Sequence, residues 1–305
     1  MILDRKVSLI GAPLDLGGAV QGASLGPTAV RMAGLERRIR ALDLDFEDLG
    51  DVPVAVPASG DPPEPSARFI REIALHCEAL RDRVDETLTR GRFPLVIGGD
   101  HAVACGTISG VARNFRRRGQ KVGLIWFDAH GDMNTPETSP SGNVHGMPLA
   151  ACLGFGHRSL TELAGAAPML DVSNCVLIGV HELDAREKEM IRKVGIRIYT
   201  MREIDMMGMQ RVMEEALEIA NDGTDGFHVS FDVDGCDVSI APGTGTRVPG
   251  GTNFRESHLV LENVADSGRL VSLELTEVNP ILDHANRTAE LAVGLVESAL
   301  GKLVL

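Results

Sequence analysis

Three side chains of metal-ligand type, Asp128, His130 and Asp132, occupy alternate positions directly after an apolar run at 122–127. In an extended backbone every second side chain points to the same face. We therefore expect two carboxylates and an imidazole to converge where a strand ends. Converging carboxylates repel one another and raise each other's pKa unless a positive charge compensates them. The pattern indicates a divalent metal site.

Two other apolar runs end in residues of the same kind. His101 follows the run at 93–97, and Asp232 and Asp234 follow the run at 227–231. Ligands of open parallel α/β sheets bind at the carboxyl ends of the strands, so these side chains are expected to meet. Each one alone has an ordinary structural explanation, such as a turn-forming aspartate. Their conjunction at three strand ends favours a metal centre.

The number and type of these side chains indicate two metal ions and hydrolytic chemistry. The candidate ligands are His101, Asp128, His130, Asp132, Asp232 and Asp234. Oxygen-rich ligation with some imidazole suits Mn²⁺ or Mg²⁺, with Fe²⁺ or Co²⁺ as alternatives, and disfavours Zn²⁺. Six ligands are too many for one catalytic ion with an open position, whereas two ions roughly 3.5–4 Å apart can share carboxylates. A hydroxide that bridges such ions is a nucleophile near neutral pH.

Short apolar runs alternate with helical patterns along the chain. We expect eight strands, at 7–10, 42–49, 93–97, 122–127, 174–180, 196–200, 227–231 and 270–275. Helices are expected at about 27–42, 70–88, 184–194, 208–221 and 286–300. This alternation predicts an α/β fold with a parallel sheet covered on both faces. Periodicity alone leaves an open, three-layered sheet and a closed barrel as alternatives.

Stretches rich in proline or glycine are interpreted as loops. The proline-rich stretch 51–66 is expected to be a surface loop, because the β/α rhythm resumes beyond it, so we expect a single domain spanning 1–305. The glycine-rich stretch 242–251 lacks a GK[ST] ending and is expected to pack as a tight loop against the site. Asp100 and Asp237 are expected to stabilise loops near the metal centre.

Composition excludes several classes of partner. The formal net charge is −13 with no long Lys/Arg tract, which argues against nucleic acid and anionic membranes. No apolar stretch approaches the roughly 20 residues that span a bilayer, and the first residues lack a signal peptide's features. Five scattered cysteines without a CxxC pair indicate reduced core residues. We expect a cytoplasmic protein that acts on a small molecule.

Five segments resemble the ureohydrolase family, which contains arginase and agmatinase, and the chain looks most like arginase. They are GGDH at 98–101, DAHGDMN at 128–134, SGNVHG at 141–146, SFDVDGCD at 230–237 and ELTEVNP at 274–280. The resemblance covers essentially the whole chain. It implies a three-layer α/β/α sandwich with an eight-stranded, mainly parallel sheet. It also implies two Mn²⁺ ions per subunit, with Co²⁺, Fe²⁺ or Ni²⁺ as alternatives, and a homotrimer or homohexamer.

The resemblance also implies how the ligands are shared between the two ions. One ion would be held by His101, Asp128, Asp132 and Asp232. The second would be held by Asp128, His130, Asp232 and Asp234. Asp128 and Asp232 would therefore bridge the two ions.

The activity implied by the resemblance is hydrolysis of L-arginine to L-ornithine and urea by a metal-bridging hydroxide. Glu277 would pair with the substrate guanidinium, and Asp132 would accept the hydroxide proton. His145 would relay a proton, a task suited to a near-neutral pKa. Thr246 would lie beside the guanidinium. The amino-acid end of the substrate would be bound by Asn134, Ser139, Ser141, Asn143, Asp184 and Glu187.

Three residues depart from the family pattern, and rival functions remain open. Ala102 and Val238 stand where Ser and Pro are usual, and Arg247 adds a positive charge beside a site for a cationic substrate. The alternatives are an agmatinase or other guanidino-acid hydrolase, and a catalytically silent metal-binding or regulatory protein. A deacetylase of the related fold needs only one zinc ion, so the six-ligand set argues against it.

Overall fold

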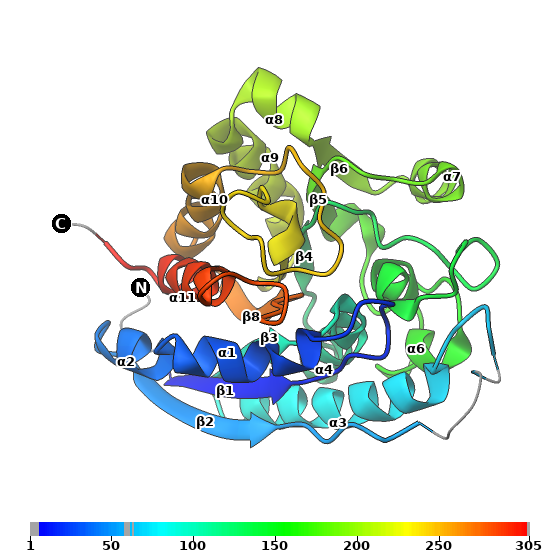
Figure 1. The fold of residues 1–305 in the computed structure, drawn as a ribbon, viewed down its shortest axis with the longest axis horizontal. Helices are drawn as coiled ribbons and strands as arrows, with labels where there is room; N and C mark the ends of the chain where they lie inside the picture. The colour runs from blue at the N-terminus through cyan, green and yellow to red at the C-terminus, as the bar shows by residue number, and fades with distance from the viewer. Residues whose placement is uncertain (1–5, 58–61, 63, 304–305) are drawn as a thin grey trace.

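The structure, a computed structural model, describes residues 6–57, 62 and 64–303. Its strands are β1 Lys6–Ala12, β2 Asp45–Asp51, β3 Phe93–Gly98, β4 Gly123–Phe127, β5 Cys175–Val180, β6 Arg197–Thr200, β7 Phe227–Asp232 and β8 Leu270–Thr276. They form one eight-stranded sheet in the order β2-β1-β3-β8-β7-β4-β5-β6 (Figure 1). All neighbouring strands pair in parallel.

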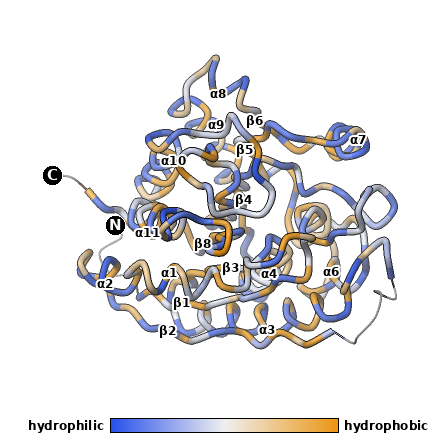
Figure 2. The backbone as a smooth tube through the Cα atoms, in the orientation of Figure 1, coloured by the Kyte–Doolittle hydropathy of each residue, from blue (hydrophilic) through white to orange (hydrophobic). Residues whose placement is uncertain are grey.

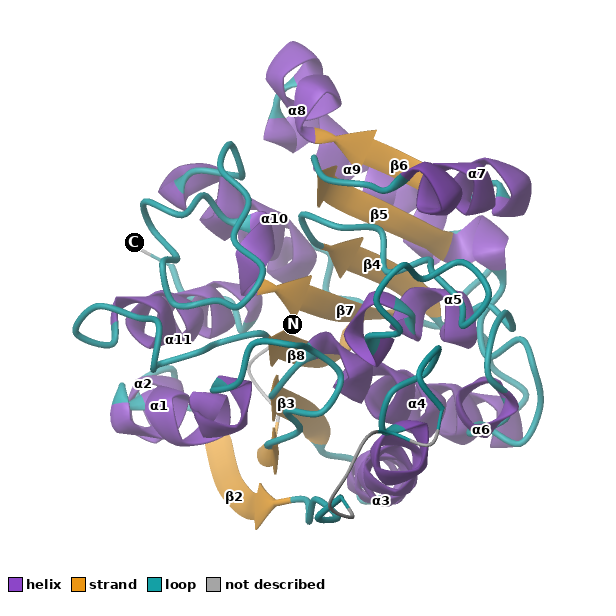
Figure 3. Ribbon diagram, turned by 45° about the vertical axis from the view of Figure 1, so that its right-hand side comes forward, coloured by secondary structure: helices purple, strands orange, loops and turns teal. Residues whose placement is uncertain are grey.

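Helices cover both faces of this sheet. Their bounds are α1 Gly26–Met32, α2 Leu35–Arg40, α3 Ile70–Thr89, α4 Ala104–Arg117, α5 Pro148–Cys152, α6 Arg158–Thr161, α7 Ala185–Val194, α8 Met201–Met207, α9 Met209–Asn221, α10 Phe254–Asp266 and α11 Arg287–Ala299. Figure 3 shows the sheet between two helical layers, with α1, α10 and α11 on one side and α3, α4 and α5 on the other. The three-layer α/β/α architecture with an open sheet is therefore confirmed.

Each face of the sheet has its own hydrophobic core, because successive strand residues point to opposite faces. In β4, Ile125 and Phe127 join the core under α9, α10 and α11. Leu124 and Trp126 join the core under α3 and α4. Hydrophobic and hydrophilic residues alternate along α3 in Figure 2, as expected for a helix with one buried face.

The helices differ from the sequence prediction at several places. The helix expected at 27–42 is divided into α1 and α2, because Gly34 adopts a left-handed φ of 89°. Helix α4 was not predicted, and it contains Gly106 and Gly110, which disfavour helix formation. Added Cβ atoms at these glycines would lie 2.9 Å from Cys77 O and 2.7 Å from Arg81 O, so the glycines permit close packing against α3. Helix α10 was also not predicted.

Strand β2 forms one open edge of the sheet and is strongly acidic. Its sequence is DFEDLGD, and it starts at Asp45, three residues later than predicted. Arg92 pairs with Asp45 at 2.9 Å and with Glu47 at 2.8 Å. Arg31 pairs with Asp48 at 2.7 Å. The acidic side chains of this edge therefore have cationic partners from other elements.

The remaining expectations on composition concern loops, cysteines and membranes. After β2 the described part of 51–66 contains no helix or strand, and residues 58–61 and 63 lie outside the described residues. All five cysteines fall within the described chain and are buried without a disulfide, as expected. Among the helices that the structure describes, none has the length and apolar character needed to cross a membrane.

Candidate metal centre and substrate pocket

Four neighbouring strands, β3, β8, β7 and β4, bring polar side chains to one edge of the sheet. His101 follows β3 on a short 3-10 helix, Asp128 follows β4, and Asp232 ends β7. Glu277 follows β8, and its backbone N–H donates to Gly99 O at 2.8 Å. The predicted convergence of three strand ends is present. The strand between β3 and β7 adds a fourth.

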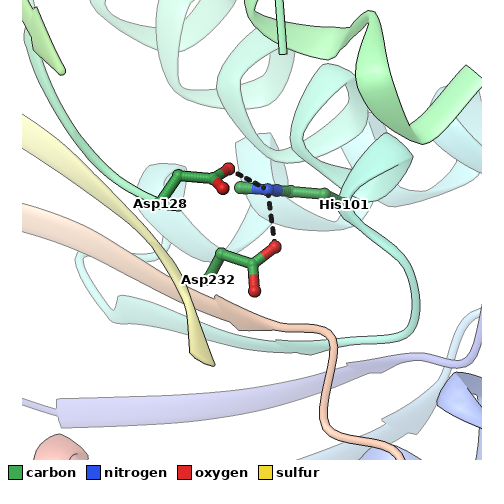
Figure 4. Close-up of side chains that lie close together, drawn as sticks. All are labelled: His101, Asp128 and Asp232. Carbon is green, nitrogen blue, oxygen red and sulfur yellow. Dashed lines mark ion pairs between the residues drawn. The ribbon is translucent and has the colours of Figure 1, made fainter. Parts of the chain in front are cut away.

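Three carboxylates surround one nitrogen of His101. Its Nδ1 lies 3.0 Å from Asp128 Oδ2, 3.0 Å from Asp232 Oδ2 and 3.1 Å from Asp132 Oδ2. Figure 4 shows the His101 ring facing the carboxylates of Asp128 and Asp232, with an ion pair to each. All four side chains are buried, yet His101 Nδ1 and Asp132 Oδ2 have no hydrogen-bond partner among the described residues. Buried nitrogen and oxygen atoms that converge without hydrogen bonds to one another fit the ligands of a divalent metal ion.

A second group of ligand atoms shares Asp128 with the first. Asp128, His130 and Asp234 offer atoms within 4.8 Å of one another, as do His101, Asp128 and Asp232. His130 Nδ1 lies 3.1 Å from Asp234 Oδ2 and 3.4 Å from Asp128 Oδ1. The two oxygens of Asp128 thus face different groups. Asp232 Oδ1 accepts a hydrogen bond from Asp234 N at 2.7 Å, so a bridging role for Asp232 stays a prediction.

The electrostatics of these residues indicate that positive charge belongs in the site. Burial and the charges of Asp234 and Asp128 raise the pKa of Asp232 well above its ordinary value. Burial and Asp128 raise the pKa of Asp132 to about 6. Burial opposes protonation of His101, but the surrounding carboxylates outweigh it and raise its pKa. Divalent cations would replace these protons as the compensating charge.

Asp128, His130 and Asp132 converge for a different reason from the one predicted, which was that every second side chain of an extended strand points to the same face. Strand β4 ends at Phe127, so these residues lie in a loop rather than in extended backbone. Asp132 adopts a left-handed φ of 49°, which turns the chain back and brings its carboxylate to His101. Glu277 also has a positive φ, of 63°. Strained backbone at non-glycine residues is typical of functional sites.

His145 and Glu277 are in direct contact, although 132 positions separate them in the sequence. His145 Nδ1 lies 3.1 Å from Glu277 Oε1, which also accepts a hydrogen bond from His101 N at 3.0 Å. Burial lowers the pKa of His145, but the Glu277 carboxylate outweighs it and raises the pKa to about 9. The near-neutral pKa expected for His145 is therefore wrong.

A cavity of about 220 Å³ opens beside the metal-ligand groups. Its walls include the predicted residues Asn134, His145, Asp184, Glu187 and Thr246. Ser139, Ser141, Asn143 and Glu277 were also predicted as site residues but are not among its lining residues. The cavity joins the candidate metal centre to most of the predicted substrate contacts.

The far end of this cavity is held together by hydrogen bonds to carboxylates. Asp184 Oδ1 accepts from Arg186 N and Glu187 N, both at 2.9 Å, and so caps α7. Asp184 Oδ2 accepts from Asn134 Nδ2 at 2.7 Å. Glu187 Oε1 accepts from Met133 N at 3.1 Å, and burial raises the pKa of Glu187 to about 7. A cationic group fits this end.

The other predicted contacts stabilise loops around the cavity. Ser139 Oγ accepts from Gly142 N at 3.0 Å, and Ser141 Oγ accepts from Asn143 N at 3.2 Å. Thr246 Oγ1 donates to Asp234 Oδ2 at 2.7 Å, so the glycine-rich loop does pack against the site. Arg247 Nη2 donates to Leu282 O at 2.8 Å and is not among the cavity lining residues.

Asp100 and Asp237 occupy the loop positions expected of them. Asp100 accepts from Gly17 N at 2.7 Å and from Ala102 N at 3.0 Å. Asp237 accepts from Ser239 N and Gly250 N, both at 2.9 Å. Each carboxylate joins backbone segments beside the candidate metal centre, as predicted.

Sequence reasoning missed residues that support the ligands. The Trp126 ring stacks on the His101 ring with centroids 4.2 Å apart, and Trp126 Nε1 donates to Asp128 Oδ2 at 3.0 Å. Glu182 and Leu183 also line the cavity. Trp126 lies inside an apolar strand, where its type gives no signal of a polar role. Its position two residues before Asp128 is the one available clue.

Comparisons with known proteins agree with this geometry. A model described as "Arginase family" matches residues 5–301. The arginase of Bacillus caldovelox is 50% identical over 98% of this chain and 99% of its own length. A solved structure of the Bacillus caldovelox arginase has a TM-score of 0.95 at 49% identity and covers 99% of this chain and 100% of that one. A structure of Entamoeba histolytica arginase in complex with L-ornithine has a TM-score of 0.88 at 29% identity, with 98% and 99% coverage.

Proposed function

The chain belongs to the arginase family and is an arginase-type amidinohydrolase, and we propose that it hydrolyses L-arginine to L-ornithine and urea. One observation carries the proposal. A single cavity joins two groups of metal-ligand atoms to a cluster formed by Asn134, Asp184 and Glu187. The first part suits hydrolysis, and the second suits the charged end of an amino acid. An L-ornithine complex of the Entamoeba histolytica relative is consistent with this choice.

We propose two Mn²⁺ ions per subunit. His101, Asp128, Asp132 and Asp232 would hold one, and Asp128, His130, Asp232 and Asp234 the other. When bound, the ions supply a nucleophile near neutral pH by lowering the pKa of a water molecule. Asp132 Oδ2, which has no hydrogen-bond partner within the described chain, would hold the ion, and the other oxygen of this carboxylate is the proposed acceptor of the proton that the water loses.

His145 and Glu277 are proposed to act as a coupled pair. Glu277 is buried and bonds His145, so a substrate guanidinium that approaches Glu277 competes with the imidazolium for one carboxylate. Two cations beside one anion repel, so binding of the guanidinium lowers the pKa of His145. His145 lines the cavity, and it would then deliver its proton to the leaving amine.

The amino-acid end of the substrate is proposed to lie at the α7 end of the cavity. Asp184 Oδ2 and Glu187 would accept hydrogen bonds from the α-ammonium group, and Asn134 Nδ2 would donate to the α-carboxylate. Ser139, Ser141 and Asn143 shape the loop that follows Asn134 and complete the proposed set. Thr246 would orient Asp234 and face the guanidinium.

The test is urea release by Mn²⁺-loaded protein from L-arginine, agmatine and 4-guanidinobutyrate. Agmatine lacks the α-carboxylate, and 4-guanidinobutyrate lacks the α-amino group and is one carbon shorter than arginine. Each lost charge-assisted hydrogen bond is worth about 1.5–3 kcal/mol, so we expect kcat/KM for arginine to exceed both others by at least about 10-fold. Preference for agmatine would show an agmatinase. Absence of urea from all three compounds, with both ions bound, would show a catalytically silent protein.

We also propose that the protein is cytoplasmic and forms a homotrimer or homohexamer. The buried, unpaired cysteines support a reducing compartment. Family membership is the basis for the oligomer. Sedimentation equilibrium of the purified protein would give the number of subunits, and a monomer would refute the assembly.

A further inference from the structure

A buried hydrogen-bonded chain runs from the far side of the His101 ring into the sheet. His101 Nε2 lies 2.8 Å from Ser230 Oγ, and Ser230 Oγ lies 2.6 Å from Glu274 Oε1. Ser230 belongs to β7, and Glu274 is its direct partner on β8 in the strand register. Ser230 and Glu274 are 0% exposed, and His101 is 1% exposed. Glu274 has no part in the proposed function.

The chemistry at its two ends fixes the direction of this chain. The Nδ1 atom of His101 faces the carboxylates of the candidate metal centre, and a nitrogen that ligates a metal carries no proton. The ring proton is therefore on Nε2, which donates to Ser230 Oγ. The Ser230 hydroxyl is then free to donate its own proton to Glu274 Oε1, which accepts as a carboxylate.

The surroundings of Glu274 keep it negatively charged. His228 Nδ1 lies 2.7 Å from Ser272 Oγ and 3.2 Å from the Ser272 carbonyl oxygen. His228 Nε2 lies 3.6 Å from Glu274 Oε1. Burial raises the pKa of Glu274, but His228, His101 and Ser230 outweigh it and lower the pKa below its ordinary value.

We propose that Glu274 is a positioning residue of the metal centre, which acts through Ser230 to hold His101 with Nδ1 facing a divalent cation. The Trp126 stack restricts the plane of the His101 ring, whereas the Ser230–Glu274 chain prevents the ring from flipping within that plane. The anchor is rigid because Ser230 and Glu274 lie on paired strands. The inference rests on the metal centre of the proposed function and not on the identity of the substrate.

The direct test measures Mn²⁺ affinity without substrate, from the electron paramagnetic resonance signal of free Mn²⁺. Loss of such a supporting carboxylate typically weakens metal binding about 10–100-fold, and we expect a loss of this size in Glu274→Gln. Glu297→Gln is the matched control. Glu297 is another buried glutamate, on α11, paired with Arg38 at 3.0 Å and Lys302 at 3.2 Å. Its variant should bind Mn²⁺ like the wild type.

A double-mutant cycle separates positioning from general damage to the core. Ser230→Ala should weaken Mn²⁺ binding to a similar extent, and adding Glu274→Gln should cause little further loss, because the chain is already broken. Wild-type Mn²⁺ affinity in Glu274→Gln would overturn the proposal. So would a double variant whose loss of affinity equals the product of the two single losses. If Glu274→Gln does not fold, unchanged affinity in Ser230→Ala overturns it equally. The wild-type protein could release no urea from arginine while Glu274→Gln still binds Mn²⁺ more weakly than the wild type. That pair of results would refute the proposed substrate and leave this inference standing.

Discussion

Replacing Asp184 by asparagine tests whether this chain recognises the α-ammonium group of its substrate. Asn is as good a helix N-cap as Asp, so Asp184→Asn should keep the bonds from Arg186 N and Glu187 N that start α7. It removes the negative charge at Oδ2, the oxygen that accepts from Asn134 in the cavity wall. The variant therefore changes charge with little change in the fold.

The structure sets the size of the expected effect. A hydrogen bond to a charged group contributes about 1.5–3 kcal/mol, which corresponds to roughly 10- to 150-fold in kcat/KM. Because Asp184 is only half-buried, we expect the lower part of this range, about 10- to 30-fold. Asp184→Ala should lose the same factor and also the helix cap, at a further cost of about 1 kcal/mol of stability.

The assay is steady-state urea release from L-arginine and from 5-guanidinopentanoate, which is arginine without its α-amino group. Asp184→Asn should reduce kcat/KM for arginine and leave that for 5-guanidinopentanoate within about twofold of the wild type. Thermal unfolding of both variants reports the loss of the cap separately. An equal loss on both substrates would refute the reasoning, because Asp184 would then act on the architecture of the site and not on the amino group.

Three further predictions concern the metal centre and the His145–Glu277 pair. Asp128→Ala removes the carboxylate shared by both ligand groups, so metal analysis should find fewer than two Mn²⁺ ions per chain and urea release should cease; full occupancy would contradict the shared role. His145→Asn should retain both ions while kcat falls about 10²–10⁴-fold, and an unchanged kcat would refute the proton relay. In metal-free protein the pKa of His145 is raised from 6.5 to about 9, so its contribution to stability is fully present below pH 6.5 and is lost as the pH rises through about 9. The difference in free energy of unfolding between wild type and His145→Asn should therefore shrink across that interval, and a constant difference would contradict the ion pair.

The convergence of the candidate metal ligands was predictable from the sequence because parallel strands place their carboxyl ends along one edge. His101, Asp128 and Asp232 each follow or end a recognisable apolar run, so local sequence patterns were enough to predict that these side chains meet. The order of the strands was not predictable from such patterns. That order inserts β8 between β3 and β7 and so places Glu277 against His101.

Contacts that depend on tertiary packing left no trace in the spacing of residues. The φ of 49° at Asp132 is a property of the folded loop, and an extended backbone was the natural expectation. The Ser230–Glu274 bond depends on the register of two strands that lie 44 positions apart in the chain. His228 bonds Ser272, and its nearness to Glu274 follows from the same register.

The acidic edge strand β2 has a consequence for how the protein behaves at high concentration. An open sheet edge is a template on which a strand of another molecule can add, and charged side chains oppose such growth. A strand of another molecule that paired with β2 would have to separate Asp45 and Glu47 from Arg92, and Asp48 from Arg31. The hydrogen bond from Arg92 lowers the pKa of Asp45, so this protection persists in mildly acidic solution. The charged residues that oppose edge-to-edge aggregation thus lie on β2, at the opposite edge of the sheet from β6, and they do not line the cavity of the candidate site.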